Sequence, residues 1–228
     1  MNRTLLITTL LVCAGTASAR EGDGNGRARD IEKINSSITA EAGQAYGDLS
    51  TVNGAIRVGS RAVIKNAETV NGSIRVEDDV RSGGLTTVNG SIQVGARSRI
   101  DGDVETVNGG IFIDRGGNVK RGVATVNGAI GLVDTDLGRG IETVNGDITV
   151  GVGSHVKGGI RVEKPGKNWG MRLGKPKVPR VVIGPNAVVD GALVFEREVT
   201  LYVHRSARIG AVSGATAQRY NSAAPPKD

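Results

Sequence analysis

The four-residue word Thr-Val-Asn-Gly occurs six times in this chain, with its threonine at positions 51, 69, 87, 106, 125 and 143. Successive copies lie 18 or 19 residues apart, and a degenerate seventh copy, "KINSSITA", begins at Lys33. A short and constant period constrains the fold strongly, because each repeat must be one structural unit that buries its apolar face only by stacking on its neighbours.

Aligned on this word, the copies share apolar columns. They are Ile38, Ile56, Ile74, Ile92, Ile111, Ile130 and Ile148; Ile34, Val52, Val70, Val88, Val107, Val126 and Val144; Ala40, Val58, Val76, Val94, Ile113, Leu132 and Val150; and Leu49, Ala67, Leu85, Val104, Val123 and Ile141. We expect all four columns to face the core, in the two-residue period of a strand with one buried face.

Eighteen residues are too few for a propeller blade, which needs about 40, but they suffice for one turn of a coil of short strands. Aromatic residues make up only 3% of the chain, so the core has to be narrow and aliphatic. The sequence therefore predicts an all-β fold, a single-stranded parallel β-helix (β-solenoid) of about nine rungs stacked roughly 4.8 Å apart, with a right-handed coil as the expectation.

The Asn-Gly pair of each repeat lies between two core positions, where the chain must bend. Asparagine and glycine tolerate positive φ, so the pair suits a corner. Stacked corners would place the asparagines in an amide ladder that bonds from rung to rung. We interpret these residues as structural: Asn53, Asn71, Asn89, Asn108, Asn127 and Asn145.

The pattern divides the chain into segments. Residues 1–19 have a charged start, an apolar run and an Ala-Ser-Ala end, which are typical of a secretory signal peptide and predict export to the periplasm, cell surface or extracellular space. Further segments are expected as follows: a flexible leader at 20–32, solenoid repeats at 33–162, an insertion at 163–180, C-terminal solenoid rungs at 181–215, and a disordered tail at 216–228.

The insertion is the main candidate binding site. Residues 161–180 hold seven basic residues and one acidic residue, together with the single tryptophan of the chain. A cationic loop with an aromatic side chain suits an anionic glycan, lipopolysaccharide or an acidic lipid surface, with no specific nucleic acid expected. The alternative is a Pro/Gly loop whose tryptophan packs over an edge of the coil. The candidate ligand-binding residues are Lys164, Lys167, Trp169, Arg172, Lys175, Lys177 and Arg180.

The sequence offers little for catalysis. It has two histidines, His155 and His204, and its single cysteine, Cys13, lies in the predicted signal peptide. Zinc clusters and Cys/His nucleophiles therefore find no residues in the mature chain. We expect a protein that is not an enzyme and that uses no metal or cofactor.

The repeats "TVNGSIRV" and "TVNGAIRV" resemble those of exported bacterial β-strand repeat proteins of the adhesin type, and the resemblance covers residues 33–162. The segment "VVIGPNAVVDGAL" is similar, more weakly, to bactofilins, which are polymer-forming β-helix scaffolds. The first resemblance implies adhesin-like binding of an anionic component of the cell envelope. The second implies a homopolymer built by end-to-end stacking of open rungs.

Overall fold

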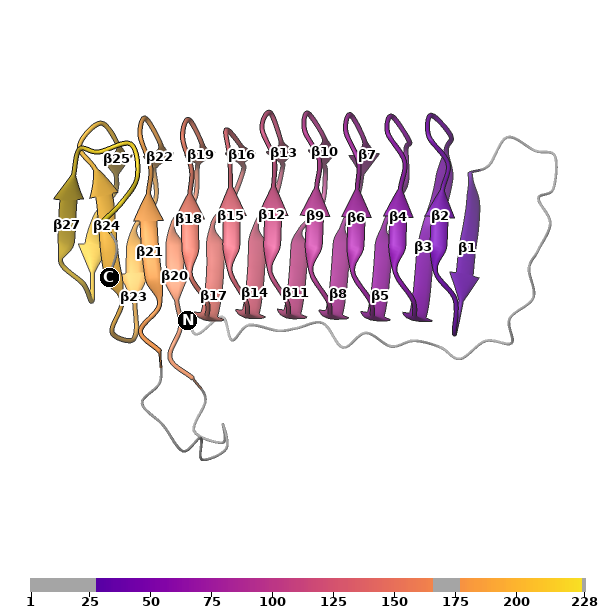
Figure 1. Ribbon diagram of the computed structural model, residues 1–228, viewed down its shortest axis with the longest axis horizontal. Helices are drawn as coiled ribbons and strands as arrows, with labels where there is room; N and C mark the ends of the chain where they lie inside the picture. The colour runs from indigo at the N-terminus through magenta and orange to yellow at the C-terminus, as the bar shows by residue number, and fades with distance from the viewer. Residues whose placement is uncertain (1–27, 166–176, 227–228) are drawn as a thin grey trace.

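The computed structural model describes residues 28–165 and 177–226. All regular structure in these ranges is β-strand, in 27 short segments and without a helix. The strands lie side by side along one long axis, and each pairs in parallel with the equivalent strand of the next turn (Figure 1). The predicted all-β parallel solenoid is therefore confirmed.

Three parallel sheets form the walls of the coil, and the first, sheet A, has ten strands. Most of its strands contain the Thr-Val-Asn segment of a repeat. In spatial order they are β1 (Arg29–Lys33), β3 (Tyr46–Asn53), β5 (Ala67–Asn71), β8 (Leu85–Asn89), β11 (Val104–Asn108), β14 (Val123–Asn127), β17 (Ile141–Asn145), β20 (Ile160–Val162), β23 (Leu193–Phe195) and β26 (Val212–Ser213).

Sheet B also has ten strands, and most of them begin at the isoleucine of a repeat. They are β2 (Ile38–Ala40), β4 (Ile56–Val58), β6 (Ile74–Val76), β9 (Ile92–Val94), β12 (Ile111–Ile113), β15 (Ile130–Leu132), β18 (Ile148–Val150), β21 (Arg180–Ile183), β24 (Thr200–His204) and β27 (Ala217–Tyr220).

Sheet C has seven strands of two residues each. They are β7 (Arg81–Ser82), β10 (Arg99–Ile100), β13 (Asn118–Val119), β16 (Asp136–Leu137), β19 (His155–Val156), β22 (Val188–Val189) and β25 (Arg208–Ile209). One strand from each sheet makes a complete rung, and rungs are numbered here from rung 1, which begins with β1, to rung 10, which begins with β26.

The coil extends further at both ends than the sequence indicates, which gives ten rungs in place of about nine. Part of the expected leader, from Arg29, forms β1 and pairs with β3. Part of the expected tail, Ala217–Tyr220, forms β27 and pairs with β24, while Arg180 belongs to β21 and not to the insertion. β1 and β27 carry the apolar columns only in part, because Ile31 and Ala217 pack against the core while Lys33 and Arg219 occupy other inward positions.

Three of the four predicted core columns are confirmed. The isoleucine column, from Ile38 to Ile148, is at most 1% exposed, and the column from Ala40 to Val150 at most 2%. The column from Leu49 to Ile141 is equally buried. Side chains of neighbouring rungs stack directly on one another, so the core is one continuous aliphatic cluster that runs the length of the coil.

The fourth column is wrong for five of its seven members, because the threonine of each Thr-Val-Asn-Gly word occupies the inward position and the valine does not; only Val126 and Val144 are buried, at 6% and 7% exposed. Thr69 is fully buried, whereas Val70 is partly exposed. Five of the six buried hydroxyls donate to a backbone carbonyl of the preceding rung, whereas the hydroxyl of Thr143 has no hydrogen-bond partner among the described residues. The donor–acceptor pairs are Thr51 to Ser36, Thr69 to Gly54, Thr87 to Gly72, Thr106 to Gly90 and Thr125 to Gly109, at 2.8–3.0 Å.

The amide ladder expected at the Asn-Gly corner is present. Each asparagine Nδ2 donates to the Oδ1 of the asparagine one rung earlier, beginning with Asn53 to Asn35, at 2.8–3.2 Å. The glycine is needed for space and not, as expected, for positive φ. A Cβ on Gly90 would lie 2.1 Å from the carbonyl oxygen of Gly72, so successive rungs touch backbone to backbone at this corner.

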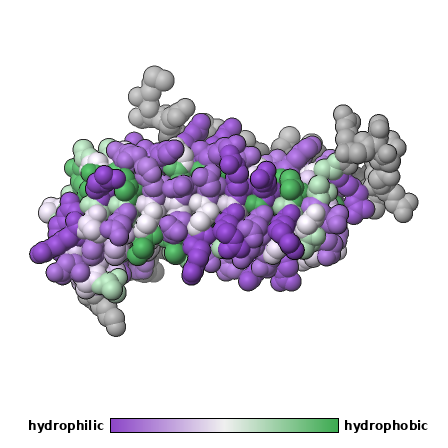
Figure 2. Space-filling view, turned by 90° about the horizontal axis from the view of Figure 1, so that it is seen from above, coloured by the Kyte–Doolittle hydropathy of each residue, from purple (hydrophilic) through white to green (hydrophobic). Residues whose placement is uncertain are grey.

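Positive φ is found at the corner between sheets B and C instead. One residue per rung adopts it in most rungs, and several are not glycine: Arg61, Asp79, Arg97, Asp134 and Asn186, with φ between 43° and 62°. This corner is the row of loops along the upper edge of Figure 1. Viewed from above, the coil presents a mostly hydrophilic surface with scattered apolar spots (Figure 2).

Candidate functional site

The insertion predicted as a binding loop connects β20 to β21 and therefore leaves the coil where sheet A meets sheet B. Lys167, Trp169, Arg172 and Lys175 lie outside the described residues. The structure describes Lys164, Lys177 and Arg180, which flank the insertion on its two sides.

Two of these three residues are engaged in holding the base of the insertion together. Lys177 Nζ lies 2.7 Å from Asp147 Oδ2, and the backbone N–H of Arg180 donates to Asp147 Oδ1 at 2.9 Å. Burial alone would raise the pKa of Asp147, but the hydrogen bonds from Lys177 and Arg180 outweigh it and lower the pKa. The Arg180 guanidinium also stacks 5.0 Å from the centre of the Tyr202 ring.

Arg197, in the turn between β23 and β24, also stabilises the base of the insertion. Its guanidinium donates to the carbonyl of Val144 at 3.1 Å, to the side-chain oxygen of Asn145, and to the carbonyl of Lys177 at 3.3 Å. Arg197 therefore ties the last residue of the amide ladder to the returning arm of the insertion. No sequence pattern indicated this role, because Arg197 lies in a segment without repeat character.

On the outgoing arm, Arg161 pairs with Glu196 at 2.7 Å, and the backbone N–H of Lys164 lies 3.5 Å from the same carboxylate. The Lys164 side chain makes no ion pair with any described residue. Of the described residues predicted to bind ligand, Lys164 alone thus offers an uncommitted charge, whereas Lys177 and Arg180 stabilise the base of the loop.

A second group of basic residues, which the sequence analysis did not single out, lies on the outer side of sheet C. Five exposed cations on this sheet, or at its edge toward sheet A, have no carboxylate within ion-pair distance among the described residues. We call them the basic face: Lys65, Arg81, Arg139, Lys157 and Arg208.

Other cations on the same side are neutralised. Asp101 accepts from Lys120 at 2.7 Å and from Arg99 at 3.2 Å, and the hydrogen bond from Lys120 is the main cause of its lowered pKa. Arg121 pairs with Asp103 at 3.5 Å. Among the described residues, Asp136 is the one carboxylate within the sheet C strands, and it has no basic partner, so this side carries an excess of positive charge.

Sheet A has the opposite character. Its outer column places a glutamate on every second rung, at Glu32, Glu68, Glu105 and Glu142, with small uncharged residues between them. None of the four forms an ion pair with a described residue. Burial and, after it, repulsion from Asp103 and Glu142 raise the pKa of Glu105. The unpaired glutamates of sheet A and the unpaired cations of the basic face thus lie on different sides of the coil.

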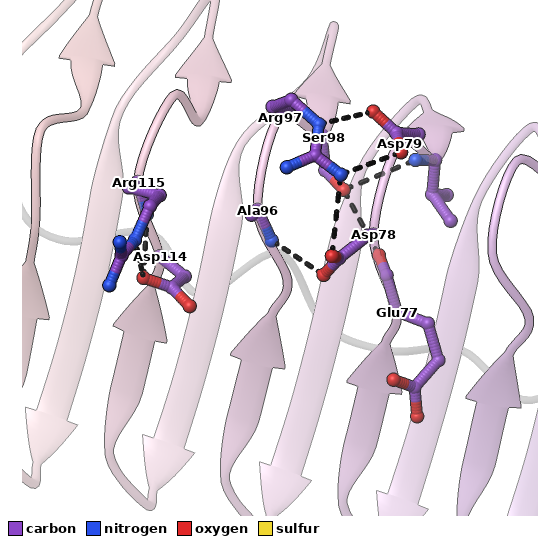
Figure 3. Close-up of polar contacts among 9 residues, drawn as sticks. Glu77, Asp78, Asp79, Ala96, Arg97, Ser98, Asp114 and Arg115 are labelled. Atoms are coloured by element: carbon purple, nitrogen blue, oxygen red, sulfur yellow. Dashed lines mark hydrogen bonds and ion pairs between the residues drawn. The ribbon is translucent and has the colours of Figure 1, made fainter.

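A dense polar cluster at the corner between sheets B and C is structural. Figure 3 shows Arg97 reaching back one rung to Asp79, with Nε–Oδ1 and Nη2–Oδ2 distances of 2.8 Å, and to Asp78 at 3.4 Å. The hydrogen bond from Arg97 lowers the pKa of Asp79. Ser98 Oγ accepts from the backbone of Val80 and donates to the carbonyl of Glu77. These contacts brace residues with positive φ and leave no group aimed at a ligand.

The two histidines lie apart and serve local contacts. His155 Nε2 lies 2.6 Å from Asp190 Oδ2, and His204 contacts Ser206 and the edge of the Tyr220 ring. Within residues 28–165 and 177–226, no group of three or more His, Cys, Asp or Glu side chains is arranged to hold a metal ion. In the same part of the chain, no helix has the length and apolar character needed to cross a bilayer.

Comparison of the chain with protein-family models, with curated proteins and with solved structures found no match.

Proposed function

We propose that this chain is a non-enzymatic, exported β-solenoid protein of the cell envelope that binds an anionic glycan, such as the saccharide and phosphate portion of lipopolysaccharide, along its basic face. The observation that carries the proposal is the gathering of five uncompensated cations on one side of a rigid coil. The unpaired glutamates lie on a different side, so they do not cancel the local positive potential.

The spacing of the cations favours a long ligand. Lys65 and Arg81 lie on rungs 2 and 3, Arg139 and Lys157 on rungs 6 and 7, and Arg208 on rung 9. At roughly 4.8 Å per rung, the basic face extends over about 34 Å along the coil axis. A small anion reaches one or two of these cations, whereas an extended polymer with repeated negative charges reaches all of them.

The chemistry of the face also favours a saccharide over single-stranded nucleic acid. Binding of unpaired bases relies on aromatic side chains on which the bases stack. The described strands of sheet C carry no aromatic residue other than His155, and Phe112, the most exposed phenylalanine, lies on sheet B. Charge and hydrogen bonding are thus the means of recognition that this side offers.

End-to-end assembly into a scaffold, the alternative function, is less well supported. Each end of the coil has a basic residue at a position that faces inward in the other rungs: Lys33 in rung 1 and Arg219 in rung 10. Stacking two copies would enclose these charges, which is costly without a carboxylate partner. We therefore favour binding over polymerisation.

The test compares two triple variants that remove the same charge. Arg81→Gln, Arg139→Gln and Lys157→Gln alter the basic face; Arg29→Gln, Arg57→Gln and Arg205→Gln remove three exposed cations elsewhere. Retention on heparin and binding to purified lipopolysaccharide are measured over a salt series, because charge-driven binding weakens as salt is added.

The basic-face variant should lose binding at least tenfold and show a weaker salt dependence, while the control variant stays within about threefold of the wild type, since three charge–charge contacts of roughly 0.5–1 kcal/mol each are lost only in the first. Equal losses in both variants would show that net charge alone drives retention. Unchanged binding in the basic-face variant would refute the proposed site.

A further inference from the structure

Within residues 28–165 and 177–226, both ends of the coil are open sheet edges. A stack of parallel rungs leaves one row of unpaired backbone N–H and C=O groups at each end, and such edges are templates for pairing with another chain. Here β1 and β26 are the outer strands of sheet A, and β2 and β27 are those of sheet B. The C-terminal end of one copy therefore offers the same two sheets, in the same parallel sense, as the N-terminal end of another.

A charged side chain at the C-terminal end disfavours stacking of a second copy there. One inward column of sheet B is apolar in nine successive rungs and ends in arginine: Ala40, Val58, Val76, Val94, Ile113, Leu132, Val150, Ile183, Val203 and Arg219. The Arg219 guanidinium lies over the end of the coil, 3.4 Å from the carbonyl oxygen of His204 and 3.5 Å from that of Ala207.

The N-terminal end repeats the arrangement in another column. Lys33 pairs in register with Thr51 and so occupies the first position of the inward threonine column. In the next rung, Thr51 donates to the carbonyl of Ser36, which belongs to the rung before it. Lys33 has no earlier rung to bond to, and its Nζ donates instead to the carbonyl of Ser37 at 2.9 Å.

Head-to-tail stacking of two copies would enclose both cations between rung 10 of one copy and rung 1 of the next. Their partners at present are backbone carbonyls and solvent, and neither is in an ion pair with a described residue. Because Lys33 and Arg219 belong to different sheets, each would meet a core column and not a carboxylate: Arg219 would meet the column that begins at Ala40, and Lys33 the column that continues through Val162 and Phe195. Burying an uncompensated charge is unfavourable and opposes the gain from the edge hydrogen bonds that stacking would form.

We propose that Lys33 and Arg219 are end caps that keep this solenoid from polymerising, and that removing both converts the two ends into an interface for a second copy of the chain. The joint pairs β26 with β1 and β27 with β2 of the next copy. This inference concerns the ends of the coil and is independent of ligand binding on the basic face.

The test is the double variant Lys33→Thr, Arg219→Val in the full chain, in which each residue becomes the one found next to it in its own column. Oligomeric state is measured by sedimentation velocity over a concentration series, and the shape of assemblies by electron microscopy. The wild type should stay monomeric, and the double variant should form unbranched assemblies that lengthen with concentration. Each single variant should assemble far less, because every joint still encloses one cation.

Two controls separate capping from loss of charge and from added hydrophobicity. Lys157→Thr with Arg208→Val removes the same charge from sheet C, and Gln218→Val adds an apolar side chain to the outer side of β27; both should remain monomeric. A folded double variant that stays monomeric, or a wild type that itself forms filaments, would overturn the proposal. If the valine variant does not fold, Lys33→Ala with Arg219→Ala decides the question in the same way.

Discussion

Replacing Ile92 with aspartate should unfold much of the coil, because Ile92 is fully buried between Ile74 and Ile111 of the adjacent rungs. Loss of a buried isoleucine side chain costs about 2–5 kcal/mol. An unpaired carboxylate in the aliphatic core adds several kcal/mol more. The sum is comparable to the roughly 5–15 kcal/mol that stabilises an ordinary domain.

The assay is urea denaturation followed by circular dichroism, with Gln93→Asp as the matched control. Gln93 is the next residue, faces solvent and accepts a hydrogen bond from Arg75 at 3.3 Å. Its replacement should change the free energy of unfolding by less than about 0.5 kcal/mol. The buried carboxyl of Ile92→Asp would have a raised pKa, so this variant should recover stability as the pH falls through that pKa. Equal effects at the two positions would refute the assigned inward and outward faces.

Three further outcomes are expected. Gly90→Ala should lower the melting temperature strongly, because its Cβ would lie 2.1 Å from a carbonyl oxygen, whereas Gly84→Ala should be tolerated, since its nearest neighbour is 3.4 Å away. Glu105→Gln should raise the free energy of unfolding at pH 7 and leave it unchanged below about pH 4. The pKa of Glu105 is raised in the folded state, so its ionised form destabilises the fold, and this penalty vanishes once the carboxyl is protonated. A variant of the insertion replaces four cations by glutamine: Lys164, Lys167, Arg172 and Lys175. It should reduce heparin retention less than the basic-face variant does, and a larger reduction would place the binding site on the insertion.

The repeat period was sufficient to predict the architecture, since an 18-residue unit with two-residue apolar alternation fits little else. Hydrophobicity alone ranks valine above threonine and therefore predicts the wrong orientation for the Thr-Val pair. Leu85 and Val88 are three residues apart, and a regular strand cannot bury both on one face. Geometry therefore turns Thr87 inward, and the carbonyl of Gly72 makes its hydroxyl acceptable there.

The basic face could not be read from the sequence for a different reason. Arg81, Arg139 and Lys157 occupy different positions within their repeats, and only closure of the coil brings them to one side. Which cations remain unpaired depends on side-chain geometry, as the pairing of Lys120 with Asp101 shows. The basic insertion is recognisable in the sequence because its charges are close together along the chain. In the structure, however, Lys177 and Arg180 hold the base of the insertion.

The glutamates on the outer side of sheet A give this side a charge pattern that repeats every two rungs. Glu68, Glu105 and Glu142 lie two rungs apart, or about 9.6 Å, which is close to the distance over which salt screens charges at 0.1 M. Deleting a single repeat between two of them would bring like charges to adjacent rungs at half that separation, whereas deleting two repeats restores the original spacing. Lengthening or shortening of this protein by duplication is therefore expected to proceed more easily in steps of two turns than in steps of one.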